Sequence, residues 1–397
     1  MDNKIALPAF VAILSIFLLC TQACSTRPEK KEIISKEEPT HNNVVNFFIE
    51  NSGSMKGYFN GNTQIKDIIK EYYDRINERQ NEGDTIKLNF INTEIENFPN
   101  DIKDYLLKSQ SKCTATYTKI DNILSMAMEG LNDSTVNIVI SDFCFTSNDG
   151  SFSMAQSDIT NSFSKRLKND ADLSVAIVKY MSNFDGVYFP GGIRCKKPLP
   201  FYLWIFGNEK QVKRIFNAPI KSSNYGILIL QPLQEIAPTI IAKKARMVEG
   251  NSIIVKEWDK DRGQSGGILQ SCSPSRENEV RYSTNICLDL SKVIRSEEEL
   301  CDIINYKISD RYSIETITKK DTGVYNFKIY TNNPSPGVIS IEYTQQDLPE
   351  WVEKSNFTGT GIPKDSTTLG VKYLIGGVYD AYHNLSNKIF ETKITLK

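Results

Sequence analysis

Residues 44–59, VVNFFIENSGSMKGYF, decide the fold. The opening run VVNFFI is almost continuously apolar, which is typical of a strand buried on both faces within a parallel sheet. The chain then runs directly into a carboxylate and two hydroxyls around a glycine, namely Glu50, Ser52 and Ser54. In α/β proteins, binding chemistry gathers at the turn that leaves such a strand. We therefore expect an α/β domain with a functional site at this turn.

The chain from residue 44 to residue 219 alternates between strand and helix patterns. Helical spacing of apolar residues predicts helices over 65–76 and 120–131, the first with Thr63 as a candidate cap. Strands separated by helices imply right-handed crossovers and a mostly parallel central sheet covered on both faces. After the first strand, the predicted strands are 85–91, 136–140, 172–180 and 201–207, and a short helix at 208–216 closes this first domain, 44–219.

The pattern changes beyond that domain. Short, often alternating apolar runs are divided by Gly, Pro, Asn and Ser, which is typical of antiparallel strands. Two segments, 296–307 and 367–382, have helical character. We expect residues 221–397 to form a β-rich, sandwich-like α+β domain. The predicted strands are 225–233, 251–258, 278–290, 323–331, 337–344 and 387–396.

The N-terminal residues have the pattern of a secretory leader. Lys4 precedes an apolar run that is too short for a comfortable transmembrane helix, and small or polar residues lead to Cys24. The segment TQAC is similar to the bacterial lipobox, which implies cleavage after residue 23 and lipidation of Cys24; Thr21 departs from the usual leucine. Residues 24–43 are charged and poor in large apolar side chains, so they predict a solvated tether.

Composition excludes several functional classes. The 397 residues are 40% hydrophobic and 24% charged, with 47 basic against 48 acidic side chains and a net charge of −1, so nothing favours a nucleic-acid partner. Six cysteines lie beyond the leader, none in a C-x-x-C pair or near a histidine, which argues against a zinc site. Their pairing stays open, between disulfides and buried free thiols.

The turn itself predicts a site for a hard cation. Short oxygen-bearing side chains around a glycine supply part of the oxygen shell that Mg²⁺ requires, and further ligands have to come from neighbouring strand ends. Two such ends carry suitable groups. Asp142 follows the strand that ends at residue 140, and the threonine-containing segment 113–120 precedes the second helix.

ENSGSM resembles the D-x-S-x-S motif of von Willebrand factor type A (VWA) domains, and NIVISDF resembles the strand and aspartate of that family's third metal-binding loop. The resemblance covers residues 44–219 and implies a Rossmann-like VWA fold. It also implies a metal-ion-dependent adhesion site (MIDAS) that holds Mg²⁺ or Mn²⁺. The implied metal ligands are Glu50, Ser52, Ser54, Asp142 and a second-loop threonine, for which Thr118 matches best and Thr116 is the runner-up.

The resemblance also implies a mode of action, namely recognition of a partner protein whose carboxylate fills an open metal position. Asn51, Met55 and Tyr58 are candidates for the partner-binding rim, whereas Phe59 fits core packing better. Glu50 departs from the family's aspartate, and its longer side chain could bind the ion directly or displace it. A metal-free interaction scaffold therefore remains an alternative.

Two other functions were weighed. Catalysis is disfavoured because the chain has only two histidines, His41 and His383, so a Ser-His-carboxylate site lacks its base. The β-rich domain could instead bind a glycan or a partner strand, with Trp258 and Trp351 as candidate stacking residues. The overall expectation is a non-enzymatic lipoprotein of the bacterial cell envelope, periplasmic or surface-exposed, that binds a protein through a metal.

Overall fold

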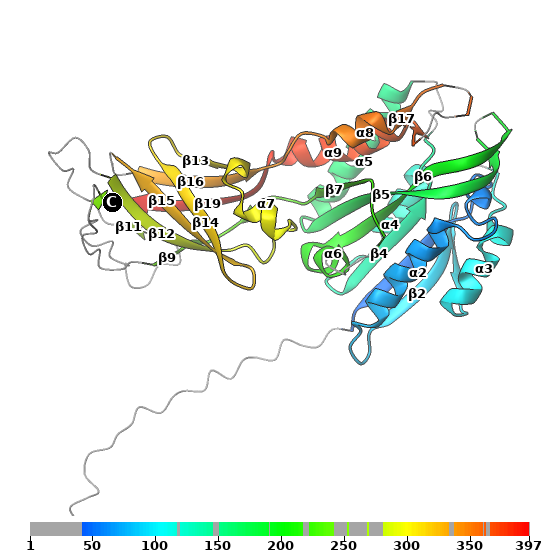
Figure 1. The fold of residues 1–397 in the computed structure, drawn as a ribbon, viewed down its shortest axis with the longest axis horizontal. Helices are drawn as coiled ribbons and strands as arrows, with labels where there is room; N and C mark the ends of the chain where they lie inside the picture. Colours follow the sequence, from blue (N-terminus) through cyan, green and yellow to red (C-terminus); the bar gives the residue numbers. More distant parts are fainter. Residues whose placement is uncertain are drawn as a thin grey trace, which may run out of the picture. The chain divides into compact units, whose positions relative to one another are not determined.

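The computed structural model describes residues 42–116, 120–145, 151–189, 191–216, 222–241, 252–253, 268–269, 281–332, 337–359, 361–362 and 366–396. The predicted leader, lipidation site Cys24 and tether lie outside these residues, as do Thr118, His41 and Trp258. Residues 42–397 cluster as one unit by their contacts. The fold is α/β, with a seven-stranded mixed sheet and further β-sheets, shown as a ribbon in Figure 1.

The seven-stranded sheet contains every strand predicted for the first domain. Its centre is parallel, because β1 pairs in parallel with β2 on one side and β4 on the other. All its other pairs are antiparallel. The spatial order is β3 (Ile95–Phe98), β2 (Thr85–Ile91), β1 (Val44–Glu50), β4 (Thr135–Ser141), β6 (Ile193–Asn208), β5 (Leu173–Tyr188) and β7 (Gly226–Leu230).

Parallel pairing is thus confined to the core of the sheet, and the sequence prediction of a mostly parallel sheet is too broad. The reason lies between β5 and β6, which form a long hairpin rather than a crossover. Residues 189–192 join them, and Gly191 and Gly192 adopt φ values of 121° and 59°. So short a glycine turn leaves no room for the helix that a parallel connection needs.

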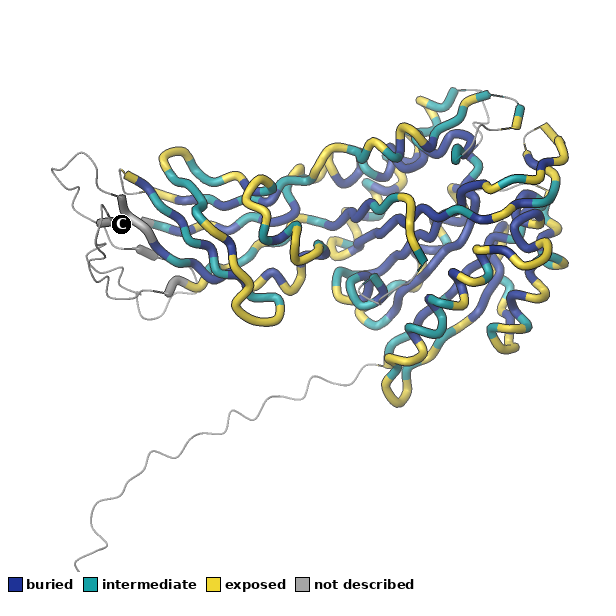
Figure 2. Tube along the Cα trace, viewed as in Figure 1, coloured by how far each residue is buried: buried dark blue, intermediate teal, exposed yellow. Residues whose placement is uncertain are grey.

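Helices cover both faces of the sheet. Alternate residues of β1 enter different hydrophobic clusters, Phe47 with α2 and α3 and Phe48 with α4, α5 and α9. Figure 2 shows the buried strands between these layers. The helices are α2 (Gln64–Asn77), α3 (Ile102–Lys112), α4 (Ile120–Met128), α5 (Phe152–Asn169), α6 (Glu209–Phe216) and α9 (Val371–Leu385). Thr63 is the N-cap residue of α2, but its hydroxyl donates to the Tyr58 carbonyl instead of capping the helix.

Two elements that lie beyond the predicted domain boundary near residue 220 pack with the first domain. Strand β7 pairs with the free edge of β5, because its apolar run GILIL extends the buried sheet. Helix α9 buries Leu374, Ile375 and Val378 in the same cluster as α4 and α5. These two segments, which the sequence assigned to the second domain, therefore complete the α/β layer.

The part beyond residue 221 contains further β-sheets, as the sequence predicts, whereas their sandwich-like arrangement stays a prediction. Ten strands form two five-stranded sheets whose buried residues belong to one hydrophobic cluster. One contains β9 (Thr239–Ile241), β10 (Ser252–Ile253), β12 (Arg281–Asp289), β14 (Ser313–Asp321) and β15 (Val324–Thr331); the other contains β8 (Gln234–Glu235), β11 (Ile268–Leu269), β13 (Tyr306–Ile308), β16 (Gly337–Thr344) and β19 (Lys388–Leu396).

Short elements complete the described chain. The segment 296–307, predicted as one helix, contains α7 (Glu297–Cys301), the 3-10 helix η2 (Ile303–Asn305) and the start of β13. The others are the 3-10 helix η1 (Met55–Gly57), helix α8 (Glu350–Lys354) and the paired strands β17 (Asn356–Phe357) and β18 (Thr368–Leu369). Within the described ranges, no helix has the length and apolar content to cross a membrane.

Candidate functional site

The turn after β1 buries its oxygen-bearing side chains. Glu50 ends the strand and is fully buried, and Ser52 and Ser54 are 2% and 6% exposed. The two serine hydroxyl oxygens lie 2.9 Å apart. The turn therefore places two hydroxyls next to each other below the surface.

The Glu50 side chain reaches across to the neighbouring parallel strand. Its Oε2 accepts a short hydrogen bond from the hydroxyl of Ser141, the last residue of β4. The Ser141 oxygen in turn accepts from the backbone N–H of Phe143, at 2.8 Å. The carboxylate is thus held at the end of β4, close to the aspartate that follows it.

Asp142 is buried, and part of its carboxylate is unsatisfied. Its Oδ1 accepts from the backbone N–H of Cys144 at 3.1 Å. Its Oδ2 has no hydrogen-bond partner in the part of the chain that the structure describes. Burial raises the pKa of Asp142, although hydrogen bonds from Cys144 and Ser54 act in the opposite direction. A buried carboxylate oxygen without a partner costs free energy, so this atom requires a proton or a cation.

The backbone after Asp142 is constrained. Phe143 has a φ of 48°, in the left-handed region that non-glycine residues rarely adopt. Its fully buried ring stacks on Trp204 with ring centroids 4.8 Å apart. Packing therefore stabilises a conformation that is intrinsically unfavourable, and such residues concentrate at functional sites.

A second loop lies alongside the turn. The backbone N–H of Gly53 donates to the Ala115 carbonyl at 2.8 Å, and the N–H of Ala115 donates to the Asn51 carbonyl at 3.1 Å. Thr116, the runner-up ligand, follows directly and is exposed. The preferred Thr118 lies outside the described residues. The structure thus brings the predicted second loop to the turn and leaves the choice between the two threonines open.

Two cysteines lie close to the carboxylates, and both are free thiols. Burial raises the pKa of Cys113, and the negative charges of Glu50 and Asp142 raise it further. Burial and Asp142 likewise raise the pKa of Cys144. Since the thiolate is the reactive form, neither cysteine is suited to act as a nucleophile at neutral pH.

The predicted rim needs a correction. Met55 and Tyr58 are 0% and 1% exposed, so neither side chain is available to a partner; Asn51 is only partly buried. The Tyr58 hydroxyl donates to the Pro200 carbonyl at 2.6 Å, and its ring packs against Phe184. Phe59 is buried, as expected. The β5–β6 hairpin covers Tyr58, so this side chain supports the turn from inside and does not form a binding surface.

That hairpin supplies surface residues that the sequence reading missed. Its outer half, 181–200, has no strand neighbour besides its own other half among the described pairings. Val187, Phe189 and Ile193, around its tip, are 42–46% exposed. A Cβ added to Gly53 would lie 4.0 Å from the Phe189 ring. The apolar alternation in FDGVYFPGGI, with its glycine turn, is the signal that could have identified this segment.

The site residues fit a hard divalent cation. Ser52 and Ser54 provide adjacent hydroxyl oxygens, and Asp142 provides a buried oxygen without a partner. Oxygen ligands of this kind are those that Mg²⁺ selects. No group of three or more His, Cys, Asp and Glu side chains suited to a metal occurs within the described ranges. A metal at this turn would therefore depend on the serine hydroxyls.

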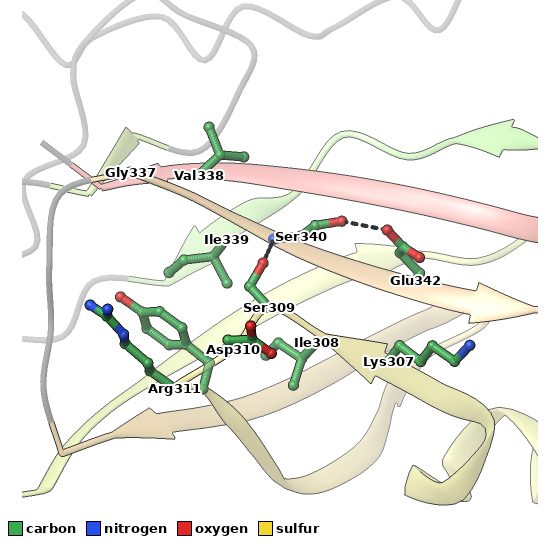
Figure 3. A pocket seen from close by; sticks show the side chains of 11 residues that line it. Lys307, Ile308, Ser309, Asp310, Arg311, Gly337, Val338, Ile339, Ser340 and Glu342 are labelled. Atoms are coloured by element: carbon green, nitrogen blue, oxygen red, sulfur yellow. Dashed lines mark hydrogen bonds between the residues drawn. The ribbon is translucent and has the colours of Figure 1, made fainter.

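A separate hollow of about 610 Å³ lies on the β-rich part, beside β13 and β16 (Figure 3). Its lining is polar, and the Ser309 hydroxyl accepts from the backbone N–H of Ser340 at 2.7 Å. None of the predicted metal ligands lines it. The candidate tryptophan Trp351 lies elsewhere, partly buried, with its indole N–H donating to the Ile227 carbonyl at 3.3 Å.

Comparisons of this chain with protein-family models, with curated proteins and with solved structures find no match.

Proposed function

We propose that the turn at residues 50–54 and Asp142 hold Mg²⁺ or Mn²⁺, and that the ion binds a carboxylate of a partner protein. The observation that carries this proposal is the buried, unpartnered Oδ2 of Asp142 beside the paired hydroxyls of Ser52 and Ser54. A divalent cation would offset the cost of burying this carboxylate. The second-loop threonine, Thr116 or Thr118, would add a further neutral ligand.

In this proposal the role of Glu50 differs from that of Ser52, Ser54 and Asp142, whose oxygens would bind the ion directly. Its carboxylate is engaged by the Ser141 hydroxyl, so it supplies a second negative charge next to the ion without needing to be a direct ligand. Serine and threonine hydroxyls are neutral and do not reduce the charge of the ion. The cation would then retain affinity for an anionic oxygen, which is the property that a carboxylate-binding site requires.

The hairpin beside the turn supports a protein partner. The exposed Val187, Phe189 and Ile193 offer apolar contact area next to the proposed ion. Arg194 and Lys196, whose side chains are 80% and 82% exposed, lie on the same hairpin. An acidic partner segment with flanking apolar residues would complement both features.

The location proposed for this activity is the bacterial cell envelope. It rests on the leader pattern and on Cys24 as the lipidated residue. A lipid anchor followed by the charged tether would leave the metal-binding turn free to meet proteins of the envelope. Radiolabelled fatty acid incorporated by the wild type but not by Cys24→Ala would support the anchor, and equal labelling of both would exclude it.

The direct test of the metal site is calorimetric titration of Mg²⁺ and Mn²⁺ into the protein from Ser25 onward. Saturable binding is expected in the wild type and should be lost in Ser52→Ala and Asp142→Asn. Ser174→Ala is a matched control, because Ser174 is an equally buried serine on β5 away from the turn. Absence of heat and of any thermal shift in a folded wild-type protein would refute the metal site.

A second candidate function is recognition of an extended partner strand by β16. Strand β13 pairs with β16 only over Tyr306–Ile308, so β16 continues past it beside the hollow in Figure 3. Ser340 directs both its backbone N–H and its carbonyl towards Ser309, and Val338, two residues away, has the same orientation. Loss of partner binding in Val338→Pro, but not in Val338→Ala or Asp142→Asn, would favour this function over the metal-dependent one.

A further inference from the structure

A basic pocket of about 490 Å³ lies at the other end of the seven-stranded sheet. It is lined by five basic residues, one acidic residue and one serine, although the whole chain has a net charge of −1. These lining residues, called the basic pocket below, are Arg79, Glu209, Lys210, Lys213, Arg214, Ser291 and Lys292. The concentration of positive charge is therefore local and does not reflect composition.

Three separate segments build the basic pocket. Helix α6 contributes its acidic residue and three of its cations, Arg79 follows α2, and Ser291 and Lys292 follow β12. The Lys213 ammonium donates to the Ser291 and Val293 carbonyls, at 2.8 and 3.0 Å. These bonds connect α6 to the loop after β12. An ammonium group has three donors, so Lys213 retains one for a ligand.

Arg214 adds a second, partly buried positive charge. Its Nε donates to the Gln211 side-chain oxygen at 3.0 Å, and its Nη1 lies 3.9 Å from Asp84 Oδ2. Its Nη2 is buried and has no hydrogen-bond partner within the described ranges. The Asp84 carboxylate already accepts bonds from Asn43 and from the Asn81 backbone. It therefore neutralises the guanidinium only in part.

The protein compensates the charges of Lys213 and Arg214 only in part. Burial lowers the pKa of Lys213, with Asp289 opposing the change, and burial lowers the pKa of Arg214, with Asp84 opposing it. Arginine nevertheless stays protonated in proteins. A bound anion would restore a favourable electrostatic environment for both cations and would accept the remaining N–H of Lys213.

We propose that the basic pocket binds a phosphate-bearing polyol, such as a glycerol phosphate or sugar phosphate, either free or as a lipid headgroup. Phosphate oxygens match several convergent cationic donors. The volume falls in the range of small-molecule sites and exceeds what a lone phosphate would fill, so the ligand has a body as well as a charge. The described residues that line the pocket are all charged or polar, which favours a polyol over a stacked base.

This site is independent of the proposed metal site. Asn43, directly before β1, accepts a hydrogen bond from Gln211 on α6 at 2.8 Å, whereas Glu50 ends the same strand at the metal-binding turn. The length of β1 thus separates the two sites. The sequence reading did not identify the basic pocket, because its cations are scattered over residues 79–292.

The test is ³¹P NMR and calorimetric titration of the full chain, in a nonionic detergent with a chelator present so that metal binding does not contribute. The probes are inorganic phosphate, glycerol 1-phosphate and the soluble short-chain lipid dihexanoyl-phosphatidylglycerol, with glycerol as the uncharged control. Saturable binding of at least one organic phosphate, weakened by added salt, is expected. Tighter binding of the lipid would identify a headgroup, and tighter binding of glycerol 1-phosphate a free metabolite.

Charge-reversal variants locate the binding. Lys210→Glu and Lys292→Glu change exposed lysines and should each weaken binding about tenfold or more. Lys103→Glu on α3 changes an equally exposed lysine outside the pocket and should leave binding unchanged. Melting temperatures confirm that all three variants fold. No saturable binding of any phosphate, or equal binding by the pocket variants and the control, would overturn the proposal.

Discussion

The two ends of the seven-stranded sheet handle charge in opposite ways. At the carboxyl ends of β1 and β4, the buried carboxylates of Glu50 and Asp142 lie at the turn that carries the hydroxyls of Ser52 and Ser54. At the amino end of β1, the basic pocket gathers five cations around one acidic side chain. Buried Asp142 Oδ2 at one end and buried Arg214 Nη2 at the other have no hydrogen-bond partner among the described residues. Opposite charges thus gather at the two ends of one sheet, and the proposed metal site and the proposed anion site differ for this reason.

The largest expected effect on the free energy of unfolding comes from ligand binding, because each ligand should stabilise the protein through its own end of the sheet only. Mg²⁺ at a hundred times its dissociation constant should raise the free energy of unfolding by about 2.7 kcal/mol. Asp142→Asn should abolish this gain, and Lys292→Glu should leave it intact, because the two residues lie at opposite ends of β1. Urea denaturation with and without Mg²⁺ measures both. If Lys292→Glu also lost this Mg²⁺-induced stabilisation, the two sites would be coupled and not independent.

The next effect concerns the support of the metal-binding turn. A Cβ added to Gly57 would lie 2.4 Å from the Phe184 ring, so Gly57→Ala forces the turn and the hairpin apart. We expect a loss of about 2 kcal/mol in stability, as for other overpacked cores, together with weaker Mg²⁺ binding.

Gly53→Ala is the stability control for that experiment, because its Cβ would meet its nearest atom at an ordinary 3.6 Å. Urea unfolding compares the two variants. Equal stability of Gly57→Ala and the wild type would show that the hairpin yields easily and does not position the turn.

At the basic end, the corresponding support is the pair of bonds from Lys213. Lys213→Met removes the donor for the Ser291 and Val293 carbonyls and should cost about 1–2 kcal/mol. Lys292→Met, which removes an exposed pocket lysine, should be nearly neutral. Urea unfolding in phosphate-free buffer measures both variants. A greater loss in Lys292→Met would mean that the two bonds contribute little to the anchoring of α6.

The two sites also differ in how far the sequence reveals them. Glu50, Ser52 and Ser54 lie within five consecutive residues after an apolar strand, and Asp142 follows another such strand. Strand periodicity and sheet topology are enough to bring these residues to the same end of neighbouring strands, whereas their role as metal ligands stays a prediction. The basic pocket depends on long-range packing of α6 against the loop after β12, which no local pattern encodes.

Long-range packing also decides two other features that the local sequence pattern does not predict, namely the β5–β6 hairpin and the burial of Tyr58. The sequence pattern predicts strands at 172–180 and 201–207 but not their relative direction. That direction depends on the short glycine turn at 189–192, so the pattern alone does not predict the hairpin. Tyr58 follows a polar turn in the sequence, which predicts a surface position. The hairpin buries it, because residues more than 100 positions later in the chain fold over the turn.

The smallest expected effect on stability comes from a surface cluster in which acidic and basic side chains are paired. On β19, hydrogen bonds from Lys393 and Lys388 lower the pKa of Glu391 to about 2, from an ordinary 4.5. Because the folded-state pKa is lowered, this stabilisation is complete above pH 4.5 and is lost as the pH falls through about 2. The two lysines are partly exposed, so solvent screening limits the contribution to about 1 kcal/mol or less.

Glu391→Gln should therefore lose stability relative to the wild type at neutral pH and converge with it towards pH 2, and 1 M salt should reduce the difference. Subtracting the variant's unfolding curve from that of the wild type removes the titration of all other carboxylates. Glu350→Gln, in an exposed pair with Lys354, is the control with the smaller expected difference. A difference larger than the effects at either end of the sheet would mean that paired surface charges matter more to the stability of this fold than the buried charges at those ends.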